Sequence, residues 1–233
     1  MRRLLLISSS TVHGSGYLDH CEEGIRELLA GRRQVLFVPW ALADHEAYAE
    51  NARKRFQAMG FHLDSIHRAT DPTAAVEAAE AVFIGGGNTF RLLKSLWDSA
   101  VVEALRRRAD HGMPYMGTSA GSNVACATIK TTNDMPIVYP PTFEALALVP
   151  FNINPHYLDP DPSSKHKGET RETRIREFHE LNEPPVVGLR EGSMLRIEGP
   201  AVRLQGSVGA RLFRRGQEAE EFSPGADLSF LLA

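Results

Sequence analysis

Short apolar runs alternate with longer amphipathic stretches through the first half of the chain. Each run is only a few residues long and largely apolar, which is typical of a strand buried within a sheet. The predicted strands are Leu4–Ser8, Gln34–Val38, Phe61–Ile66, Ala81–Ile84 and Tyr115–Gly117. Strands of this kind, separated by helices, predict an α/β fold with a mostly parallel open sheet and helices on both faces.

The stretches between the strands carry signals for the start and end of helices. Asp44 can cap a helix that runs to about Met59, where Gly60 follows. Asp71-Pro72 opens another helix with a capping residue and a proline at the first helical position. Further helices are predicted over Tyr17–Leu29, from Thr89, over Ala100–Ala109 and from Glu169 to about Asn182.

Residues 131–165 break this rhythm with seven prolines and polar clusters between them. A loop of this length inside a compact domain usually carries function. A strand over Val186–Leu189 follows, and the alternation from Ser193 to Phe213 predicts β-hairpins near the C-terminus. We find no repeat or clear linker, so the simplest prediction is a single α/β domain over residues 1–233.

Composition narrows the class of protein. The net charge of −3 gives no sign of a surface for nucleic acid or an acidic membrane. Cys21 and Cys126 form neither a disulfide framework nor a metal cluster, which favours a reducing compartment. The apolar run after Arg3 is too short for a signal peptide or a membrane span. We therefore expect a cytoplasmic protein, a monomer or homodimer, with no metal and no cofactor.

The segment Gly117-Thr118-Ser119-Ala120-Gly121 places a serine between two glycines, after an apolar run and before a predicted helix. In a nucleophile elbow, a sharp strand-to-helix turn exposes the serine hydroxyl, and the helix N-terminus leaves amides free to face negative charge. The pattern alone is weak, because a glycine-rich helix start with a capping serine looks the same.

A serine nucleophile needs a histidine base and a carboxylate that orients it. Among nine histidines, His156 stands out because it follows Pro155 at the edge of the long loop. Glu191 comes just after the strand Val186–Leu189, whereas Asp134 precedes Pro136. Glu191 could equally be a surface charge, and Asp134 could form an Asx turn.

Two further segments offer polar groups. Gly85-Gly86-Gly87-Asn88 lacks the spacing of a P-loop or dinucleotide site, but its amides could form an oxyanion hole with Ala120, or simply a tight turn. The charged run from His166 to Arg174 is typical of a solvated helix face. Alternatively, Arg171 binds a substrate carboxylate.

Taken together, these segments resemble the peptidase E (α-aspartyl dipeptidase) family. The resemblance rests on Gly85–Phe90, Gly117–Gly121, Thr131–Val138, Asn152–His156 and His166–Arg171, in that order and spacing. It implies a fold similar to class I glutamine amidotransferases or flavodoxin. It also implies a serine peptidase that cleaves Asp-X dipeptides through an acyl-enzyme.

The resemblance also implies roles for single residues. Ser119 is the expected nucleophile and His156 the base. The resemblance allows either Glu191 or Asp134 as the orienting acid, and we favour Glu191 because a carboxylate at a strand end is rigidly held. Gly87 and Ala120 are the expected oxyanion donors. Arg171 is expected to bind the substrate aspartate, and Asn88 is expected to contact substrate. Two rival functions are a cyanophycinase-like peptidase acting on β-aspartyl-arginine and a non-catalytic binding module.

Overall fold

The computed structural model describes residues 1–161, 163 and 168–232. Its strands are β1 (Arg3–Ile7), β2 (Gln34–Val38), β3 (His62–Ser65), β4 (Val82–Ile84), β5 (Tyr115–Thr118), β6 (Asn152–Pro155), β7 (Val186–Leu189), β8 (Ser193–Glu198), β9 (Ala201–Gly206), β10 (Ala210–Phe213) and β11 (Glu220–Phe222). Its α-helices are α1 (Glu22–Leu28), α2 (His45–Ala58), α3 (Pro72–Ala78), α4 (Thr89–Asp98), α5 (Val102–Asp110), α6 (Ala120–Ala125) and α7 (Arg171–Leu181). Short 3-10 helices are η1 (Asp19–Cys21), η2 (Ile66–Arg68) and η3 (Ser229–Leu232).

The five apolar runs of the first half form a parallel sheet, as predicted. The strand order is β3-β2-β4-β5-β1, and β8 and β9 extend the sheet as antiparallel strands beside β1. In the register of the two central strands, Leu4 lies opposite Tyr115 and Ile7 opposite Thr118. The carboxyl ends of β1, β4 and β5 therefore meet at one edge of the sheet.

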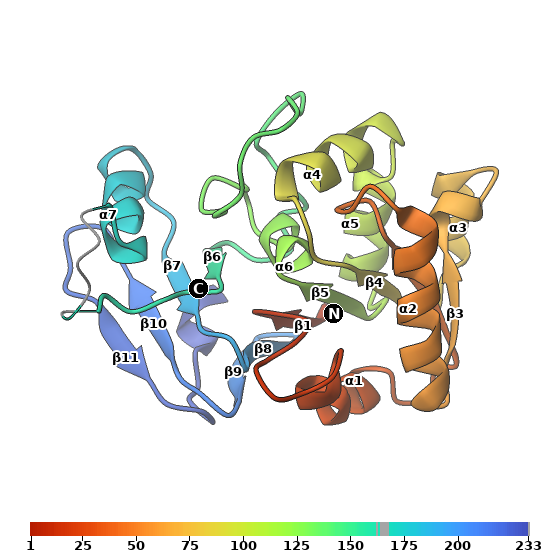
Figure 1. Cartoon of the computed structure of the whole chain (residues 1–233), viewed down its shortest axis with the longest axis horizontal. Helices are drawn as coiled ribbons and strands as arrows, with labels where there is room; N and C mark the ends of the chain where they lie inside the picture. Colours follow the sequence, from red (N-terminus) through yellow and green to blue (C-terminus); the bar gives the residue numbers. More distant parts are fainter. Residues whose placement is uncertain (162, 164–167, 233) are drawn as a thin grey trace.

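Helices cover both faces of this sheet (Figure 1), which confirms the predicted layering. On one face, α1 and α2 bury Ile25 and Phe56 against alternate residues of the strands, such as Leu5. On the other face, α3, α4, α5 and α6 contribute a larger apolar cluster that includes Leu92 and Leu105. Asp44 and Asp71 cap α2 and α3 as predicted, accepting from the amides three residues on at 2.9 and 3.0 Å.

A second sheet of four strands lies at the other side of the molecule, with α7 beside it (Figure 1). Its order is β11-β10-β7-β6, so the predicted strand Val186–Leu189 pairs with β6 and β10 and not with the first sheet. We did not predict β6, because Asn152 and Asn154 give it no apolar alternation. Their buried amides instead donate to the carbonyls of Thr128 (3.0 Å) and Thr131 (2.9 Å).

The first helix is shorter than predicted. The sequence predicted a helix over Tyr17–Leu29, whereas α1 begins at Glu22, after the short 3-10 helix η1. Leu18 has a left-handed backbone (φ 60°), and the Arg55 guanidinium donates a hydrogen bond of 2.9 Å to the carbonyl of Tyr17. A carbonyl bound in this way is not used by a helix, so tertiary contacts overrode the local pattern.

Both cysteines are buried and free. Cys126 packs at the end of α6, where burial raises the pKa of its thiol to about 12. Within the described residues, no helix is both long enough and apolar enough to cross a membrane.

Candidate active site

Ser119 occupies the turn between β5 and α6. Its backbone has φ 51° and ψ −110°, a conformation that costs a residue with a side chain roughly 1–3 kcal/mol. The flanking glycines permit this turn: a Cβ at Gly117 would overlap the Gly121 carbonyl, and a Cβ at Gly121 would overlap that of Ile84. Ser119 therefore sits in a strained elbow where the backbones of β4, β5 and α6 meet.

The Ser119 hydroxyl is directed at a histidine. Ser119 stands at the N-cap of α6 but makes no side-chain cap hydrogen bond. Its Oγ lies 2.9 Å from Nε2 of His156 instead. The alternative of a capping serine thus has no support in the geometry.

His156 follows the last residue of β6 and also has a positive φ of 52°. Its amide donates to the Ser8 hydroxyl at 2.9 Å, and Asn133 donates to the carbonyl of Pro155 at 2.7 Å. These bonds fix the backbone on both sides of the imidazole. The base is therefore held by the ends of β1 and β6 together.

Glu191 completes a chain of three side chains. Its Oε1 lies 2.6 Å from Nδ1 of His156, and the two side chains are 49% and 38% exposed. Because a carboxylate only accepts hydrogen bonds, the imidazole proton is assigned to Nδ1. That leaves Nε2 with a free lone pair facing the Ser119 hydroxyl.

Asp134, the alternative acid, is engaged elsewhere. Its Oδ2 accepts from the Thr89 amide (2.7 Å), the Thr89 hydroxyl (2.6 Å) and the Thr132 hydroxyl (3.1 Å). These donors hold residues 131–135 against the first turn of α4. The structure thus brings Glu191, and not Asp134, to His156.

Gly86 lies against the nucleophile, and Gly87 follows it against the loop that holds Ala41 and Leu42. A Cβ built on Gly86 would approach the Ser119 Cβ to 3.1 Å, and Gly87 has a φ of 135° that favours glycine. Among the described residues, the amides of Gly87 and Ala120 have no hydrogen-bond partner. Both amides thus remain free to meet an oxyanion.

The Asn88 side chain makes two hydrogen bonds within the protein, and its predicted contact with substrate stays a prediction. Its Oδ1 caps α4 by accepting from the Arg91 amide at 3.0 Å, and its Nδ2 donates to the Met135 carbonyl at 2.8 Å. The Oδ1 bond caps the helix and the Nδ2 bond reaches the neighbouring loop, so Asn88 connects Met135 to the start of α4.

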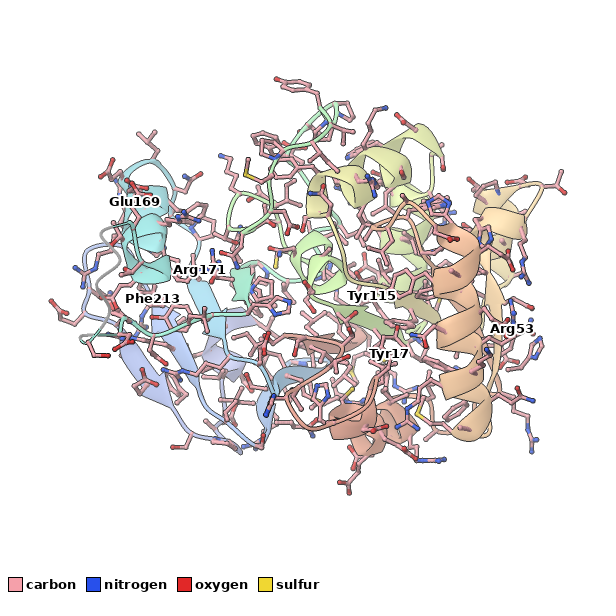
Figure 2. All side chains as sticks on the ribbon, in the orientation of Figure 1. Tyr17, Arg53, Tyr115, Glu169, Arg171 and Phe213 are labelled. Carbon is pink, nitrogen blue, oxygen red and sulfur yellow. The ribbon has the colours of Figure 1, made fainter. Side chains whose placement is uncertain are left out.

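Arg171 begins α7 and is labelled in Figure 2 between that helix and β6. It is half-buried, and its guanidinium makes no ion pair or hydrogen bond with a described residue. Burial lowers the pKa of Arg171, Arg174 lowers it further, and Asp134 acts in the opposite direction. A cavity of about 440 Å³ adjoins it, lined in part by Leu158 and Asp159. His166 and Lys167 lie outside the described residues.

Arg190, immediately before Glu191, was not singled out from the sequence. It binds Asp159 through two hydrogen bonds of 2.8 and 2.7 Å and Glu221 through two of 3.0 Å. The Asp159 carboxylate, followed by Glu221, raises the pKa of Arg190 above its usual value. This side chain ties the loop after His156 to the strand end that carries Glu191.

Ser8 was also missed, although it ends the first predicted strand. Its buried Oγ donates to the Leu189 carbonyl at 2.7 Å and accepts from the His156 amide. One hydroxyl therefore connects the end of β1 to the backbones that carry the base and the acid.

We expect Ser8→Ala to reduce both stability and turnover. Losing the hydroxyl leaves the part-buried His156 amide without its partner, while the Leu189 carbonyl keeps the Tyr157 amide at 3.2 Å; we expect a cost of about 1–3 kcal/mol of unfolding free energy. The adjacent Ser9 is a matched control, because its buried Oγ has no partner among the described residues. Urea unfolding and kcat should be nearly unchanged in Ser9→Ala; equal effects of the two substitutions would contradict the role of Ser8.

Comparison with known proteins shows which family this sequence matches. The model of peptidase family S51 matches residues 4–205. A protein named Peptidase E from Streptomyces coelicolor is 54% identical over 229 residues, spanning 98% of this chain and 94% of the relative. A probable alpha-aspartyl dipeptidase from Drosophila melanogaster is 50% identical, spanning 99% of this chain and 98% of the relative.

A solved structure shares the fold. The crystal structure of a peptidase from an acI-B1 Actinobacterium superposes with a TM-score of 0.75 at 16% identity, covering 99% of this chain and 97% of that one. The family model spans the strand ends that carry Ser8, Ser119, His156 and Glu191. The chain belongs to peptidase family S51.

Proposed function

We propose that this protein is a serine dipeptidase that hydrolyses the peptide bond after an N-terminal aspartate through an acyl-enzyme on Ser119. The observation that carries the proposal is the hydrogen-bonded chain from Ser119 through His156 to Glu191, built on a strained elbow. Two full-length relatives, named Peptidase E and probable alpha-aspartyl dipeptidase, support the substrate class.

In the first half of the reaction, Nε2 of His156 removes the Ser119 proton while Oγ attacks the carbonyl carbon of the aspartyl residue. The tetrahedral intermediate collapses when His156 passes that proton to the leaving amine. An aspartyl ester on Ser119 remains. A water molecule, deprotonated in turn by His156, then hydrolyses the ester, releases aspartate and restores the serine hydroxyl.

Glu191 holds the imidazole in the tautomer that this cycle needs and stabilises its positive charge. The negative charge that develops on the carbonyl oxygen falls at the N-terminus of α6, where the Ala120 amide is free, and opposite Gly87. Two preorganised amide donors stabilise such an oxyanion, and each contributes about 10²- to 10³-fold to kcat.

Arg171 supplies the preference for aspartate. The half-buried Arg171 guanidinium pairs with no carboxylate among the described residues, and the substrate β-carboxylate supplies the opposite charge. A neutral residue at this position leaves the cation unpaired in the bound complex, and the site therefore rejects it.

We expect Arg171→Met to lower kcat/KM for Asp-Leu by about 10²-fold or more while leaving Ala-Leu hydrolysis nearly unchanged. Arg174 is a suitable control because it already pairs with Glu169 at 3.6 Å. Arg174→Met should keep the preference. Wild-type protein that cleaves Asp-Leu and Ala-Leu equally well would exclude the proposed specificity.

The proposed location is the cytoplasm and the proposed partner a small peptide, with the protein acting as a monomer or homodimer. Two buried, free cysteines fit a reducing compartment.

A further inference from the structure

Two arginines, at the starts of α4 and α7, share an environment that surface arginines seldom have. Arg91 and Arg171 are both half-buried, and neither guanidinium forms an ion pair or hydrogen bond with a described residue. Most other arginines of the described chain pair with a carboxylate, as Arg190 and Arg106 do. Leaving a partly desolvated cation unpaired is unfavourable unless a ligand supplies the opposite charge.

Arg91 belongs to the structure that borders the oxyanion site. It lies in the first turn of α4, and its amide is capped by Asn88, the residue after Gly87. The Asn88 amide donates to the Ala41 carbonyl at 2.9 Å, and Leu42 Cδ2 lies 2.7 Å from a Cβ built on Gly87. The loop between β2 and α2 therefore packs directly against Gly87 and Asn88.

The charge of Arg91 is also felt at His45, the first residue of α2. Burial lowers the pKa of His45, His67 lowers it further, and the charge of Arg91 acts in the same direction. The His45 ring also interacts with the Leu42 backbone, which raises that pKa. The start of α4, which carries Arg91, thus adjoins the loop that covers Gly87, and Gly86 in turn lies against Ser119.

The chemistry of a dipeptide supplies a matching group. Its C-terminal carboxylate is only one residue beyond the bond that is cleaved, and successive Cα atoms are about 3.8 Å apart. A cation that recognises this carboxylate must therefore lie close to the oxyanion site. An Asp-X dipeptide carries two carboxylates, one on the aspartate side chain and one at its end. Arg91 and Arg171 are two half-buried cations that pair with no carboxylate among the described residues.

We propose that Arg91 binds the C-terminal carboxylate of the leaving residue and thereby restricts the enzyme to dipeptides. The inference rests on the proposed function, since it assigns a second subsite to the same reaction. A planar guanidinium suits a terminal carboxylate because it can donate two parallel hydrogen bonds. A longer peptide places a neutral amide at this position, which offers one acceptor and no charge.

The test compares Asp-Leu with Asp-Leu amide, which differ only in the terminal charge. Wild-type protein should have a kcat/KM about 10- to 100-fold higher for the acid than for the amide. Arg91→Met should remove this preference by slowing Asp-Leu hydrolysis, with hydrolysis of the amide unchanged. Arg91→Lys, which keeps a point charge without the planar fork, should retain part of the preference.

Lys94 provides the matched control, one helical turn beyond Arg91 and paired with Asp98 at 2.5 Å. Lys94→Met removes the same charge from the same helix and should leave both substrates unaffected. The inference is overturned if Arg91→Met slows both substrates equally or neither, or if Lys94→Met acts in the same way.

Failure of this inference is distinguishable from failure of the proposed function. A wild-type protein that cleaves Asp-Leu and its amide equally, but not Ala-Leu, keeps the proposed function and refutes the role of Arg91. A wild-type protein that cleaves neither aspartyl substrate refutes both. Thermal melts of each variant verify that a lost rate does not come from unfolding.

Discussion

Replacing Ser119 with alanine should lower kcat for Asp-Leu by about 10⁴- to 10⁶-fold while the protein stays folded. The hydroxyl that attacks the substrate is lost, whereas β5, α6 and the His156–Glu191 pair remain in place. Steady-state hydrolysis measures the effect, and a circular dichroism melt verifies the fold. Activity close to that of wild type would exclude an acyl-enzyme on Ser119.

The backbone at the same position gives an independent check. A residue with a Cβ is strained at φ 51° and ψ −110°, whereas glycine is not. Ser119→Gly and Ser119→Ala should both be inactive, but the glycine variant should be more stable by about 1 kcal/mol. The opposite order of stability in urea unfolding would contradict a strained elbow.

Replacing Glu191 with glutamine should lower kcat by about 10³- to 10⁴-fold with little loss of stability. A glutamine amide can offer its N–H to Nδ1, which favours the tautomer that carries its proton on Nε2, the nitrogen facing Ser119. Such an imidazole cannot accept the serine proton. The measurement is kcat for Asp-Leu together with the urea midpoint.

Asp134→Asn is the matched variant, because it makes the same chemical change in the competing carboxylate. Its effect should be the reverse: a loss of about 1–3 kcal/mol of unfolding free energy and a change in kcat within about tenfold. The expected loss follows from the three hydrogen bonds that Asp134 accepts from Thr89 and Thr132. A larger kcat effect in Asp134→Asn than in Glu191→Gln would assign the acid to Asp134.

The sequence predicted those elements whose own residues determine their conformation. Gln34–Val38 is a strand with the predicted bounds, because an apolar run between turn residues has few alternatives. The α1 region differs because Arg55, distant in sequence, binds the carbonyl of Tyr17. β6 escaped prediction because its asparagine side-chain N–H groups donate to the carbonyls of Thr128 and Thr131, and that pairing exists only in the folded chain.

The residues of the site also fall into those that a local motif predicts and those that depend on the folded chain. A local motif pointed to Ser119, but choosing between Glu191 and Asp134 required knowing which strand lies beside which. The pairing of β6 with β7 places Glu191 next to His156, 35 residues away in sequence. Ser8 and Arg190 act through contacts between separate strand ends, so no short pattern could reveal them. The cap that Asn88 forms on α4 and its bond to Met135 were likewise not predicted, because the bond to Met135 exists only in the folded chain.

The Ser119–His156 hydrogen bond joins two sheets. Ser119 follows a strand of the seven-stranded sheet, whereas His156 and Glu191 follow strands of the four-stranded sheet. Catalysis needs these atoms placed to within a fraction of an ångström. The value of kcat therefore depends on the relative position of the two sheets. A ligand or substitution that shifts their junction can switch the enzyme off while each sheet keeps its own structure.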